Sequence, residues 1–440
     1  MSANLQSEGE PAAGRVPAPF ARGRWLAFVL IGASCLVALT LRTGKARPLP
    51  VAASSPRVAV NAGLTSLQLL GSKLFDEPAL SEPPGKACSS CHEAERAFTG
   101  NAGSRIPAVA AGSRPDVFGN RNVPGIAYAS FRPPFSFVSE TDGDGPPHLE
   151  PQGGFFWDGR ANSLSEQAKG PLLNPREMNN SSAASVVDKV RRSSSASLFR
   201  SLFGANAFDN VDSAFDRIAQ ALAAFESSPR FHPFSSKFDE VLRRRATFSA
   251  LEARGFELFK DPEKGNCIAC HSGNERSNDP ADWLFTDFTF DALGLPRNPA
   301  LPDNAAETAF DLGLCRQEGL AHRAPAGVEV ESLCGAFQVP TLRNVEVTAP
   351  YGHNGVFATL TDVVRFYVTR DTNPERWYPT RAGSPRQFDD LPPQYRGNVN
   401  RDEAPYDRKP GQAPRLSEQE IAAVVAFLRT LTDRPASAAR

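Results

Sequence analysis

The segment Ser66-Leu-Gln-Leu-Leu-Gly-Ser-Lys-Leu-Phe-Asp-Glu-Pro78, followed by Cys88-Ser-Ser-Cys91-His92, occurs in a second version later in this chain of 440 residues. The second version is Ala250-Leu-Glu-Ala-Arg-Gly-Phe-Glu-Leu-Phe-Lys-Asp-Pro262, followed by Cys267-Ile-Ala-Cys270-His271. Each long segment has apolar residues at helical spacing and stops at a proline, which ends a helix. Two copies of one unit predict two similar domains.

The Cys-x-x-Cys-His motif that ends each copy is typical of covalently attached c-type haem. Two thiols bond the haem vinyl groups, and the histidine that follows ligates the iron. We therefore predict two haem c groups, with covalent attachment and axial iron ligation by Cys88, Cys91, Cys267, Cys270, His92 and His271. Two alternatives stay open, namely one zinc ion bound by the four cysteines and a redox-active dithiol, although a thioredoxin-like motif needs a βαβ context.

The composition narrows the class of protein. The formal net charge is −1 and 41% of the residues are hydrophobic, with 33 Gly and 38 Pro. These values exclude collagen-like, coiled-coil and multi-span membrane proteins. A near-neutral chain also lacks the positive charge on which nucleic-acid binding depends, so we expect no nucleic-acid partner.

The N-terminal region carries an uncharged apolar run from Trp25 to Leu41, preceded by a basic stretch. Such a run is either a long signal-peptide core or a minimal transmembrane helix. No small-x-small cleavage site follows closely, so we favour an uncleaved membrane anchor over a cleaved signal. Because c-type haem is attached outside the cytoplasmic membrane, we expect the rest of the chain in the periplasm, tethered to the inner membrane.

These observations divide the chain into regions. We predict a cytoplasmic n-region at residues 1–24, the anchor or signal at 25–41, a linker at 42–62, and c-type haem domains at 63–245 and 246–440. Apolar stripes predict helices over Ala214–Ser227 and Ser417–Thr432, and capping boxes open at Ser249 and Ser417. No convincing run of alternating strands occurs. The predicted fold class is mainly α, with two cytochrome-c-like haem domains and long loops rich in proline and glycine.

Cys315 and Cys334 lie outside the haem motifs. They form an even pair in a compartment that is expected to be oxidising, so we predict a disulfide that closes the loop between them. The alternative is two free buried thiols.

Several further segments resemble the bacterial di-haem cytochrome c peroxidase family. The matching segments are Phe156-Trp-Asp-Gly-Arg-Ala161, Glu166-Gln-Ala-Lys-Gly-Pro-Leu172, Asn174-Pro-Arg-Glu-Met178, Val339-Pro-Thr-Leu-Arg-Asn-Val345 and Thr348-Ala-Pro-Tyr-Gly-His-Asn-Gly355. The likeness covers about residues 62 to 433. It implies a periplasmic di-haem oxidoreductase, a peroxidase that reduces hydrogen peroxide through high-valent haem iron and takes electrons from a protein partner.

The resemblance assigns catalytic roles to three residues. Peroxide cleavage needs an open iron position, a base that moves a proton between the peroxide oxygens, and a polar group that orients the peroxide. Family residues on the distal side of the N-terminal, peroxidatic haem match Gln167 and Glu177. Trp157 matches the family tryptophan between the two haems, where a readily oxidised indole suits electron transfer. The alternative role of Trp157 is that of a large core side chain.

Three further residues are expected near the haems. Arg160 and Arg343 are candidates to pair with haem propionates, for which bidentate arginine donors are well suited. Surface salt bridges are the alternative for both arginines. His353 matches a family histidine close to the haem region, and we expect a hydrogen-bonding role for it.

The family also binds one Ca²⁺ between its domains, through two carbonyls and an asparagine side chain. The carbonyls match Thr348 and Pro350, whereas the asparagine position aligns with Tyr128 in this chain. Because calcium needs several oxygen ligands, this departure weakens the expectation of a bound calcium ion.

The axial ligand of the C-terminal haem departs from the conventional family pattern, which has a methionine. The matching position is Tyr367 in Val364-Arg-Phe-Tyr367, and the two methionines, Met1 and Met178, lie elsewhere. A thioether is soft and favours ferrous iron, whereas a phenolate is hard and favours ferric or more oxidised iron. A tyrosine here resembles MauG and its relative MbnH, which oxidise a residue of a partner protein. A core tyrosine on a helix is the alternative.

The distal side of the N-terminal haem is also expected to differ from the conventional pattern. Resting peroxidases often hold a histidine there, but His148, the only candidate between His92 and Trp157, lies too near Trp157 to match. We interpret His148 as a loop residue in solvent and predict an open, high-spin haem. The leading function is MauG-like oxidation of a partner residue. The alternatives are a conventional cytochrome c peroxidase with a small cytochrome donor and a non-catalytic di-haem electron carrier.

Overall fold

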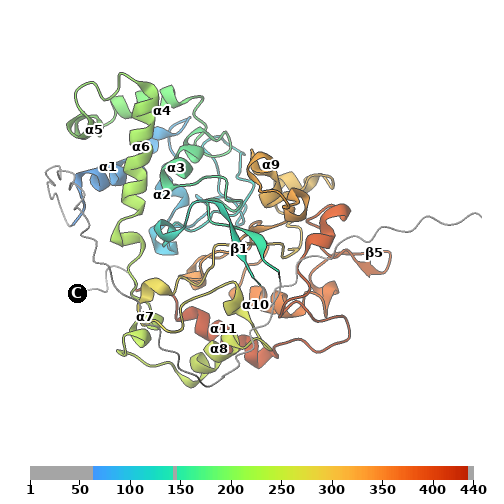
Figure 1. The fold of residues 1–440 in the computed structure, drawn as a ribbon. Coiled ribbons are helices and arrows are strands. Elements are labelled where there is room, and N and C mark those ends of the chain that lie inside the picture. The colour runs from blue at the N-terminus through green and yellow to red at the C-terminus, as the bar shows by residue number, and fades with distance from the viewer. Residues whose placement is uncertain (1–62, 142–145, 435–440) are drawn as a thin grey trace, which may run out of the picture.

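The computed structural model describes residues 63–141 and 146–434. Helices are the main regular secondary structure, beside a few short strands, which confirms the mainly α fold (Figure 1). The α-helices are α1 (Ser66–Phe75), α2 (Cys88–Cys91), α3 (Leu164–Leu173), α4 (Ala183–Arg192), α5 (Ala196–Phe203), α6 (Val211–Glu226), α7 (Lys237–Leu242), α8 (Ala250–Lys260), α9 (Leu320–Arg323), α10 (Leu360–Thr369) and α11 (Glu418–Arg429). Antiparallel pairs are formed by β1 (Ser136–Glu140) with β2 (His148–Gln152), β3 (Phe290–Asp291) with β4 (Phe337–Gln338), and β5 (Thr380–Arg381) with β6 (Ser384–Pro385).

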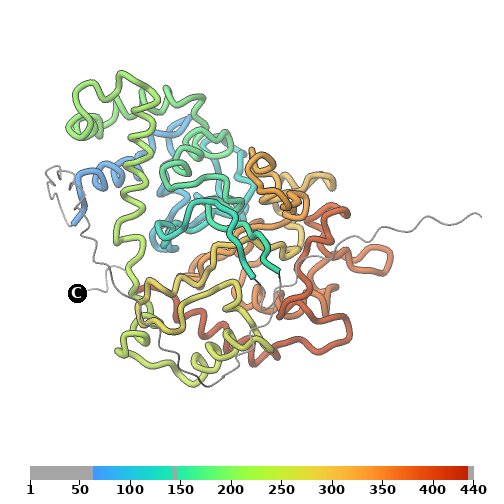
Figure 2. The backbone as a smooth tube through the Cα atoms, in the orientation of Figure 1, coloured from blue at the N-terminus to red at the C-terminus, as the bar shows by residue number. Residues whose placement is uncertain are grey.

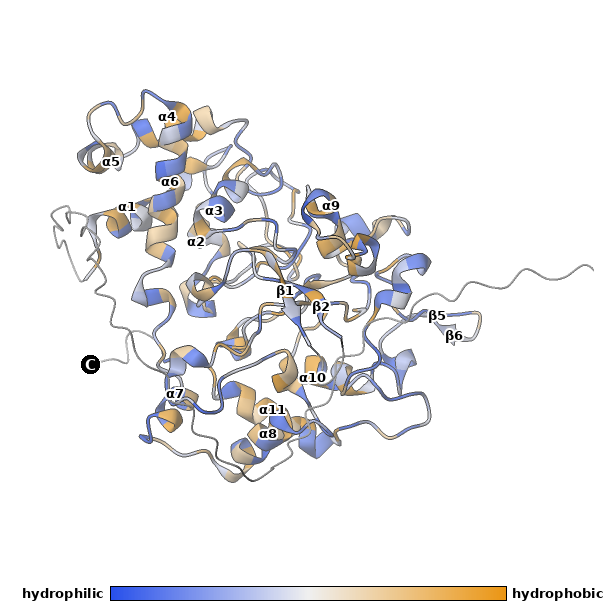
Figure 3. Ribbon diagram, viewed as in Figure 1, coloured by the Kyte–Doolittle hydropathy of each residue, from blue (hydrophilic) through white to orange (hydrophobic). Residues whose placement is uncertain are grey.

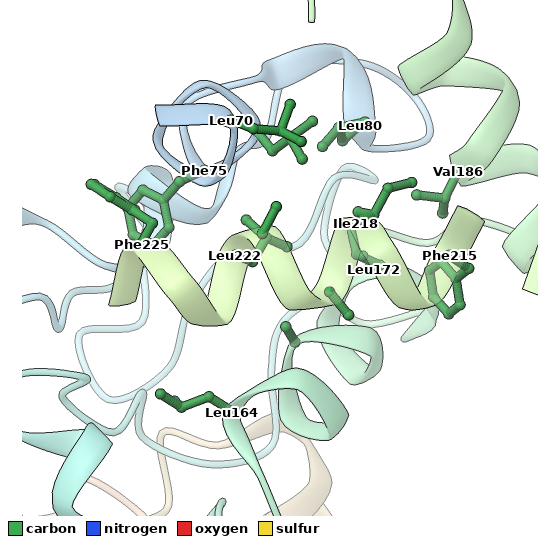
Figure 4. Close-up of a cluster of buried hydrophobic side chains, with 14 of the residues drawn as sticks. Leu70, Phe75, Leu80, Leu164, Leu172, Val186, Phe215, Ile218, Leu222 and Phe225 are labelled. Carbon is green, nitrogen blue, oxygen red and sulfur yellow. The ribbon is translucent and has the colours of Figure 1, made fainter. Parts of the chain in front are cut away.

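The first half of the chain packs around helix α6. Figure 4 shows Ile218, Leu222 and Phe225 of α6 with Leu70 and Phe75 of α1 close by, and all five belong to one buried cluster. Full burial of a leucine or phenylalanine side chain contributes roughly 1.5–3 kcal/mol. This cluster therefore holds α1 against α6, and the loop that follows α1 carries the first haem motif.

The second half has its own apolar core, in which Phe259 of α8 packs with Val424 and Phe427 of α11. Figure 2 shows the blue-to-green first half beside the yellow-to-red second half. Phe238 of α7 packs in the second core, whereas the first core ends at Phe231. The predicted domain border between residues 245 and 246 stays a prediction.

Two glycines occupy equivalent helix crossings. A Cβ atom at Gly71 would lie 1.9 Å from the carbonyl oxygen of Ala221, and one at Gly255 would lie 1.9 Å from that of Ala423. Any side chain would push the helices apart, so glycine is needed where α1 meets α6 and where α8 meets α11. The same contact in both halves agrees with the duplication predicted from the sequence.

Side-chain caps set the helix ends. The capping boxes predicted at Ser249 and Ser417 are present, and the hydroxyl of each accepts a hydrogen bond from the third amide of its helix. Helix α6 begins at Val211, earlier than predicted, because the Asn210 side chain accepts from the Ser213 amide. Hydrophobic and hydrophilic residues alternate along α6 in Figure 3, as expected of a helix with one buried face.

Cys315 and Cys334 form a disulfide, which confirms that prediction. The bond closes a loop with a sequence separation of 19 residues, and this loop contains α9. Closing a loop of this size restricts the unfolded chain and stabilises the fold by about 3 kcal/mol in the chain-entropy description.

Asp433 joins segments from both halves of the chain. Its carboxylate accepts hydrogen bonds from the Tyr128 hydroxyl at 2.8 Å, the Asn344 amide group at 2.9 Å and the Ser235 backbone amide at 2.8 Å. Tyr128 packs in the core of the first half. The Asp433 side chain therefore holds Tyr128 of the first half, Ser235 between the two cores and Asn344 of the second half in fixed relative positions.

The predicted membrane segment at residues 25–41 lies outside the described residues, as do the regions 1–24 and 42–62. No helix within residues 63–141 and 146–434 is long and apolar enough to cross a bilayer. The membrane anchor therefore stays a prediction.

Candidate active site

Each Cys-x-x-Cys-His motif lines a cavity of its own. The larger cavity, of about 250 Å³, is lined by the cysteines and histidine of the second motif. The smaller cavity, of about 50 Å³, is lined by those of the first motif. The four thiols are thus divided between two cavities, and the described residues contain no cluster of three or more side chains able to hold a metal ion. The alternative of one zinc ion shared by the four cysteines is wrong.

A hydrogen bond fixes the orientation of His92. The residue follows the helical turn of α2, and its Nδ1 lies 2.8 Å from the Phe98 carbonyl oxygen. Because a carbonyl only accepts, Nδ1 carries the proton and Nε2 keeps its lone pair for a metal. Burial lowers the pKa of His92, which keeps the ring neutral. This geometry fits an axial iron ligand.

His271 repeats the arrangement in the second half. Its Nδ1 donates to the Phe285 carbonyl oxygen at 3.1 Å, and burial lowers the pKa of His271 to about 4. Phe98 and Phe285, which supply the two carbonyls, both have left-handed backbones, with φ of 60° and 54°. This conformation is uncommon outside glycine and costs free energy. Both halves nevertheless adopt it, and in both it places a carbonyl oxygen at the Nδ1 atom of the motif histidine. Both donor sets fit covalently bound haem c.

The smaller cavity brings the residues predicted to act on peroxide to the first haem motif. Gln167 comes from α3 and Glu177 from the loop that follows it. Asn174 Nδ2 donates to Glu177 Oε1 at 2.6 Å. Burial raises the pKa of Glu177, while Asn174 and the Arg160 guanidinium act in the opposite direction. Met178 is buried in the core of the first half.

Glu226, at the end of α6, lines the same cavity and was absent from the sequence prediction. The residue is 5% exposed, and its Oε2 has no hydrogen-bond partner. Burial raises the pKa of Glu226 to about 8, so the carboxyl is largely protonated at neutral pH. The sequence does contain a signal, because Glu226 lies four positions after Leu222 and therefore on the buried face of the helix.

Tyr367 of α10 lines the larger cavity together with His271. Burial raises the pKa of the Tyr367 phenol well above its usual range, so the phenolate forms here only beside a cation. A second tyrosine, Tyr406, lines the cavity beside it, with ring centroids 5.5 Å apart. The Tyr406 phenol lowers the pKa of Tyr367, against the larger effect of burial. Tyr406 was not predicted, because it comes from a loop without regular structure.

Trp157 lines the larger cavity, and its indole Nε1 donates to the Asn122 carbonyl at 2.8 Å. Thr348 and Pro350, the predicted calcium ligands, line the cavity as well. The Asn122 side chain lies 2.7 Å from the Pro350 carbonyl oxygen. Tyr128, which was aligned with the calcium-binding asparagine, does not line this cavity, and its hydroxyl bonds to Asp433.

The two predicted propionate partners have protein partners in the structure. Arg160 pairs with Asp158 at 2.8 Å, and its guanidinium lies 3.5 Å from the centroid of the Phe156 ring. Arg343 is fully buried and forms an ion pair with Asp239 at 3.0 Å. Its guanidinium also donates to two backbone carbonyls. Arg343 lines the larger cavity with the second haem motif, and both of its terminal nitrogens donate to the Asp239 carboxylate, so its pairing with a propionate stays a prediction.

His353 lines the larger cavity, where its ring stacks on Phe337 with centroids 3.5 Å apart. Its Nε2 lies 3.3 Å from Asp390 Oδ2, but the two groups are not aligned as a hydrogen bond. The predicted hydrogen-bonding residue is thus close to a carboxylate, with its Nε2 still available.

His148 is the first residue of strand β2 and pairs with Glu140 in the ladder, so it lies in a strand and not in a loop. Neither cavity is lined by it. His92 is the histidine that lines the smaller cavity, and no other described histidine does so.

Known proteins with similar sequences or structures extend across both halves. The sequence profile of the di-haem cytochrome c peroxidase family matches residues 66–247. MauG of Paracoccus denitrificans is 36% identical over 376 residues, which are 84% of this chain and 89% of MauG. Cytochrome c551 peroxidase of Nitrosomonas europaea is 29% identical, over 72% of this chain and 78% of that protein.

A solved structure agrees with these relatives. The di-haem peroxidase BthA of Burkholderia thailandensis superposes with a TM-score of 0.77 and 41% identity, over 84% of this chain and 86% of BthA. The likeness therefore includes the overall fold as well as the sequence. With two haem motifs that each line a cavity, this chain belongs to the di-haem cytochrome c peroxidase and MauG family and is a di-haem peroxidase.

Proposed function

We propose that this protein is a periplasmic di-haem enzyme that reduces hydrogen peroxide and, like MauG, draws the electrons from a residue of a partner protein. The observation that carries the proposal is Tyr367, which lines the larger cavity with His271. No methionine lines that cavity, and Met178, the methionine of the described residues, packs in the core of the first half. A hard phenolate ligand favours oxidised iron, which suits the storage of oxidising equivalents.

The smaller cavity is the proposed site of peroxide reduction. The haems, when bound, supply the oxidation-reduction chemistry. Glu177 takes the proton from one peroxide oxygen and delivers it to the departing oxygen, and the pKa raised by burial suits both steps. Asn174 holds Oε1 of Glu177, which leaves Oε2 for the proton. The Gln167 amide orients the peroxide by a hydrogen bond.

Electron exchange between the two sites is proposed to pass through Trp157, which lines the larger cavity. His353 and Arg160 are proposed to act in the haem environment, His353 through the ring nitrogen that has no hydrogen bond in the structure. A calcium ion at the Thr348 and Pro350 carbonyls is also a proposal. Both carbonyl residues line the cavity that contains Trp157.

The location and organisation of the chain are part of the proposal. We place cytochrome-c-like haem domains at residues 63–245 and 246–440, tethered to the inner membrane by residues 25–41. The disulfide between Cys315 and Cys334 supports an oxidising compartment such as the periplasm.

Electron paramagnetic resonance of the resting ferric protein tests the open site. Because no histidine other than His92 lines the smaller cavity in the described chain, we expect one high-spin and one low-spin haem signal. Two low-spin signals would contradict the open site and favour the electron-carrier alternative.

The role of Glu177 is tested by Glu177→Gln. We expect the rate of reaction with hydrogen peroxide to fall by about 10²-fold or more, the usual contribution of a positioned acid-base group. Both haems should remain attached, as checked by the pyridine haemochrome spectrum. Glu166→Gln is the matched control, since Glu166 is exposed on the same helix as Gln167 and does not line the cavity. Equal rates for the two variants would exclude Glu177 as the acid-base group.

The MauG-like and conventional alternatives differ in their electron donor. Stopped-flow experiments compare decay of the peroxide-oxidised protein with a reduced small cytochrome c and with the protein encoded by the neighbouring gene. A new covalent modification in the neighbouring protein, found by mass spectrometry, supports the MauG-like function. Rapid decay with the cytochrome alone supports a conventional peroxidase.

A further inference from the structure

Tyr406 lies against the residue proposed to ligate the C-terminal haem. The side chain is 7% exposed and lines the larger cavity beside the Tyr367 ring. The rings meet at 34° between their planes with centroids 5.5 Å apart. The two tyrosines are far apart in the sequence, so the contact is formed by the tertiary fold and not by neighbouring residues of the chain.

The loop that carries Tyr406 is held on both sides. The Arg370 guanidinium lies 4.6 Å from the centroid of the Tyr406 ring and donates to the Asn400 carbonyl at 2.6 Å. Asn266, directly before the second haem motif, donates to the Ala404 carbonyl at 3.1 Å. Arg370 is fully buried and belongs to the same helical region as Tyr367. The position of Tyr406 is therefore fixed relative to both the motif and Tyr367.

The proposed ligation sets the direction of a hydrogen bond between these two neighbouring phenols. A tyrosine that binds iron does so through its phenolate oxygen, which has no proton to donate. Tyr406 must then be the donor and Tyr367 the acceptor. A hydrogen bond to a charged acceptor is roughly twice as strong as one between neutral groups.

We propose that Tyr406 is a positioning residue that donates a hydrogen bond to the Tyr367 oxygen, directs that oxygen into the cavity and raises the reduction potential of the C-terminal haem. The inference rests on the proposed ligation by Tyr367. A hydrogen bond to a ligand oxygen withdraws electron density from it, so the ligand stabilises ferric iron less. Tyr406 thereby tunes the ligand without touching the iron.

The test uses the holoprotein and its Tyr406→Phe variant. The ring and its contact with Arg370 are kept, and only the hydroxyl is lost. We expect the midpoint potential of the C-terminal haem, from spectroelectrochemical titration, to fall. A tenfold change in the relative affinity of the ligand for ferric over ferrous iron corresponds to about 59 mV for one electron. Tyr378→Phe is the matched control, because it removes a buried phenol that donates to the Gly294 carbonyl at 2.6 Å and not to Tyr367.

A measurement on the unaltered protein avoids dependence on the folding of a variant. In D₂O the phenolate bands of Tyr367 in the resonance Raman spectrum should shift, because the proton donated by Tyr406 is replaced by deuterium. The shift should be absent in Tyr406→Phe. Phenolate bands that are the same in H₂O and D₂O, or an unchanged potential in Tyr406→Phe, would overturn the inference about Tyr406.

Tyr367→Phe separates this inference from the proposal on which it rests. If Tyr367→Phe leaves the absorption spectrum of the C-terminal haem unaltered, then Tyr367 is not a ligand and both ideas fail. If Tyr367→Phe changes that spectrum while Tyr406→Phe changes neither the potential nor the phenolate bands, only the role of Tyr406 fails.

Discussion

Replacing Glu226 with glutamine should make the protein more stable at alkaline pH. The side chain is buried at the end of α6, and one of its carboxyl oxygens has no hydrogen-bond partner. An uncharged amide of nearly the same shape removes the charge that burial penalises. The expected gain depends on pH, which separates it from a change in packing.

The pH dependence follows from the pKa of Glu226, which rises from 4.5 to about 8 on folding. Between these values the folded state binds more protons than the unfolded state, so stability falls as the pH rises. Below about pH 4.5 the carboxyl is neutral in both states, and the penalty is absent. At about 1.4 kcal/mol for each pH unit, the full penalty above pH 8 is on the order of 5 kcal/mol, which is an upper limit.

Urea denaturation of the holoprotein from about pH 5 to pH 9, followed by circular dichroism, measures this difference. Wild type and Glu226→Gln should have similar free energies of unfolding at pH 5, and the variant should be increasingly more stable toward pH 9. Glu257→Gln on α8 is the control, because its side chain is 66% exposed. A stability difference between wild type and Glu226→Gln that is the same at every pH would refute the reasoning.

Three further changes test other parts of the fold. Replacing Cys315 and Cys334 together with serine should lower the free energy of unfolding by about 3 kcal/mol, measured by denaturation without reductant; an unchanged value would show that the disulfide adds nothing. Asp239→Asn should cost about 3–5 kcal/mol, because the buried Arg343 guanidinium loses its counter-charge. A loss as small as that of a surface charge would argue against the ion pair. Gly255→Ala should cost about 1–3 kcal/mol, seen as a lower Tm, because its Cβ would lie 1.9 Å from a carbonyl oxygen of α11; an unaltered Tm would contradict this crossing.

Features set by neighbouring residues could be predicted from the sequence. Helix caps such as Ser249 and Ser417 depend on three or four consecutive residues, and both are present. The two haem motifs are equally local. The mainly α fold and the duplication followed from these short patterns, because each pattern carries its own physical cause.

Features set by contacts between distant segments could not be predicted in this way. Arg343 was expected near a propionate, but Asp239, more than a hundred positions earlier, meets its guanidinium. Tyr128 was aligned with a calcium ligand, whereas Asp433 determines where its hydroxyl points. Tyr406 was absent from the prediction, because only the folded loop brings it to the larger cavity.

The hydrogen bonds that the Asp433 carboxylate accepts from Tyr128, Ser235 and Asn344 bear on how fast electrons pass between the two halves. Electron tunnelling slows exponentially as the gap between donor and acceptor widens, so even a small hinge movement would change its rate greatly. The hydrogen bonds from the Tyr128 hydroxyl, the Ser235 amide and the Asn344 side chain to Asp433 oppose such a movement. We therefore expect the tunnelling gap to be the same whether or not a partner protein has docked, so that docking controls only the delivery of electrons.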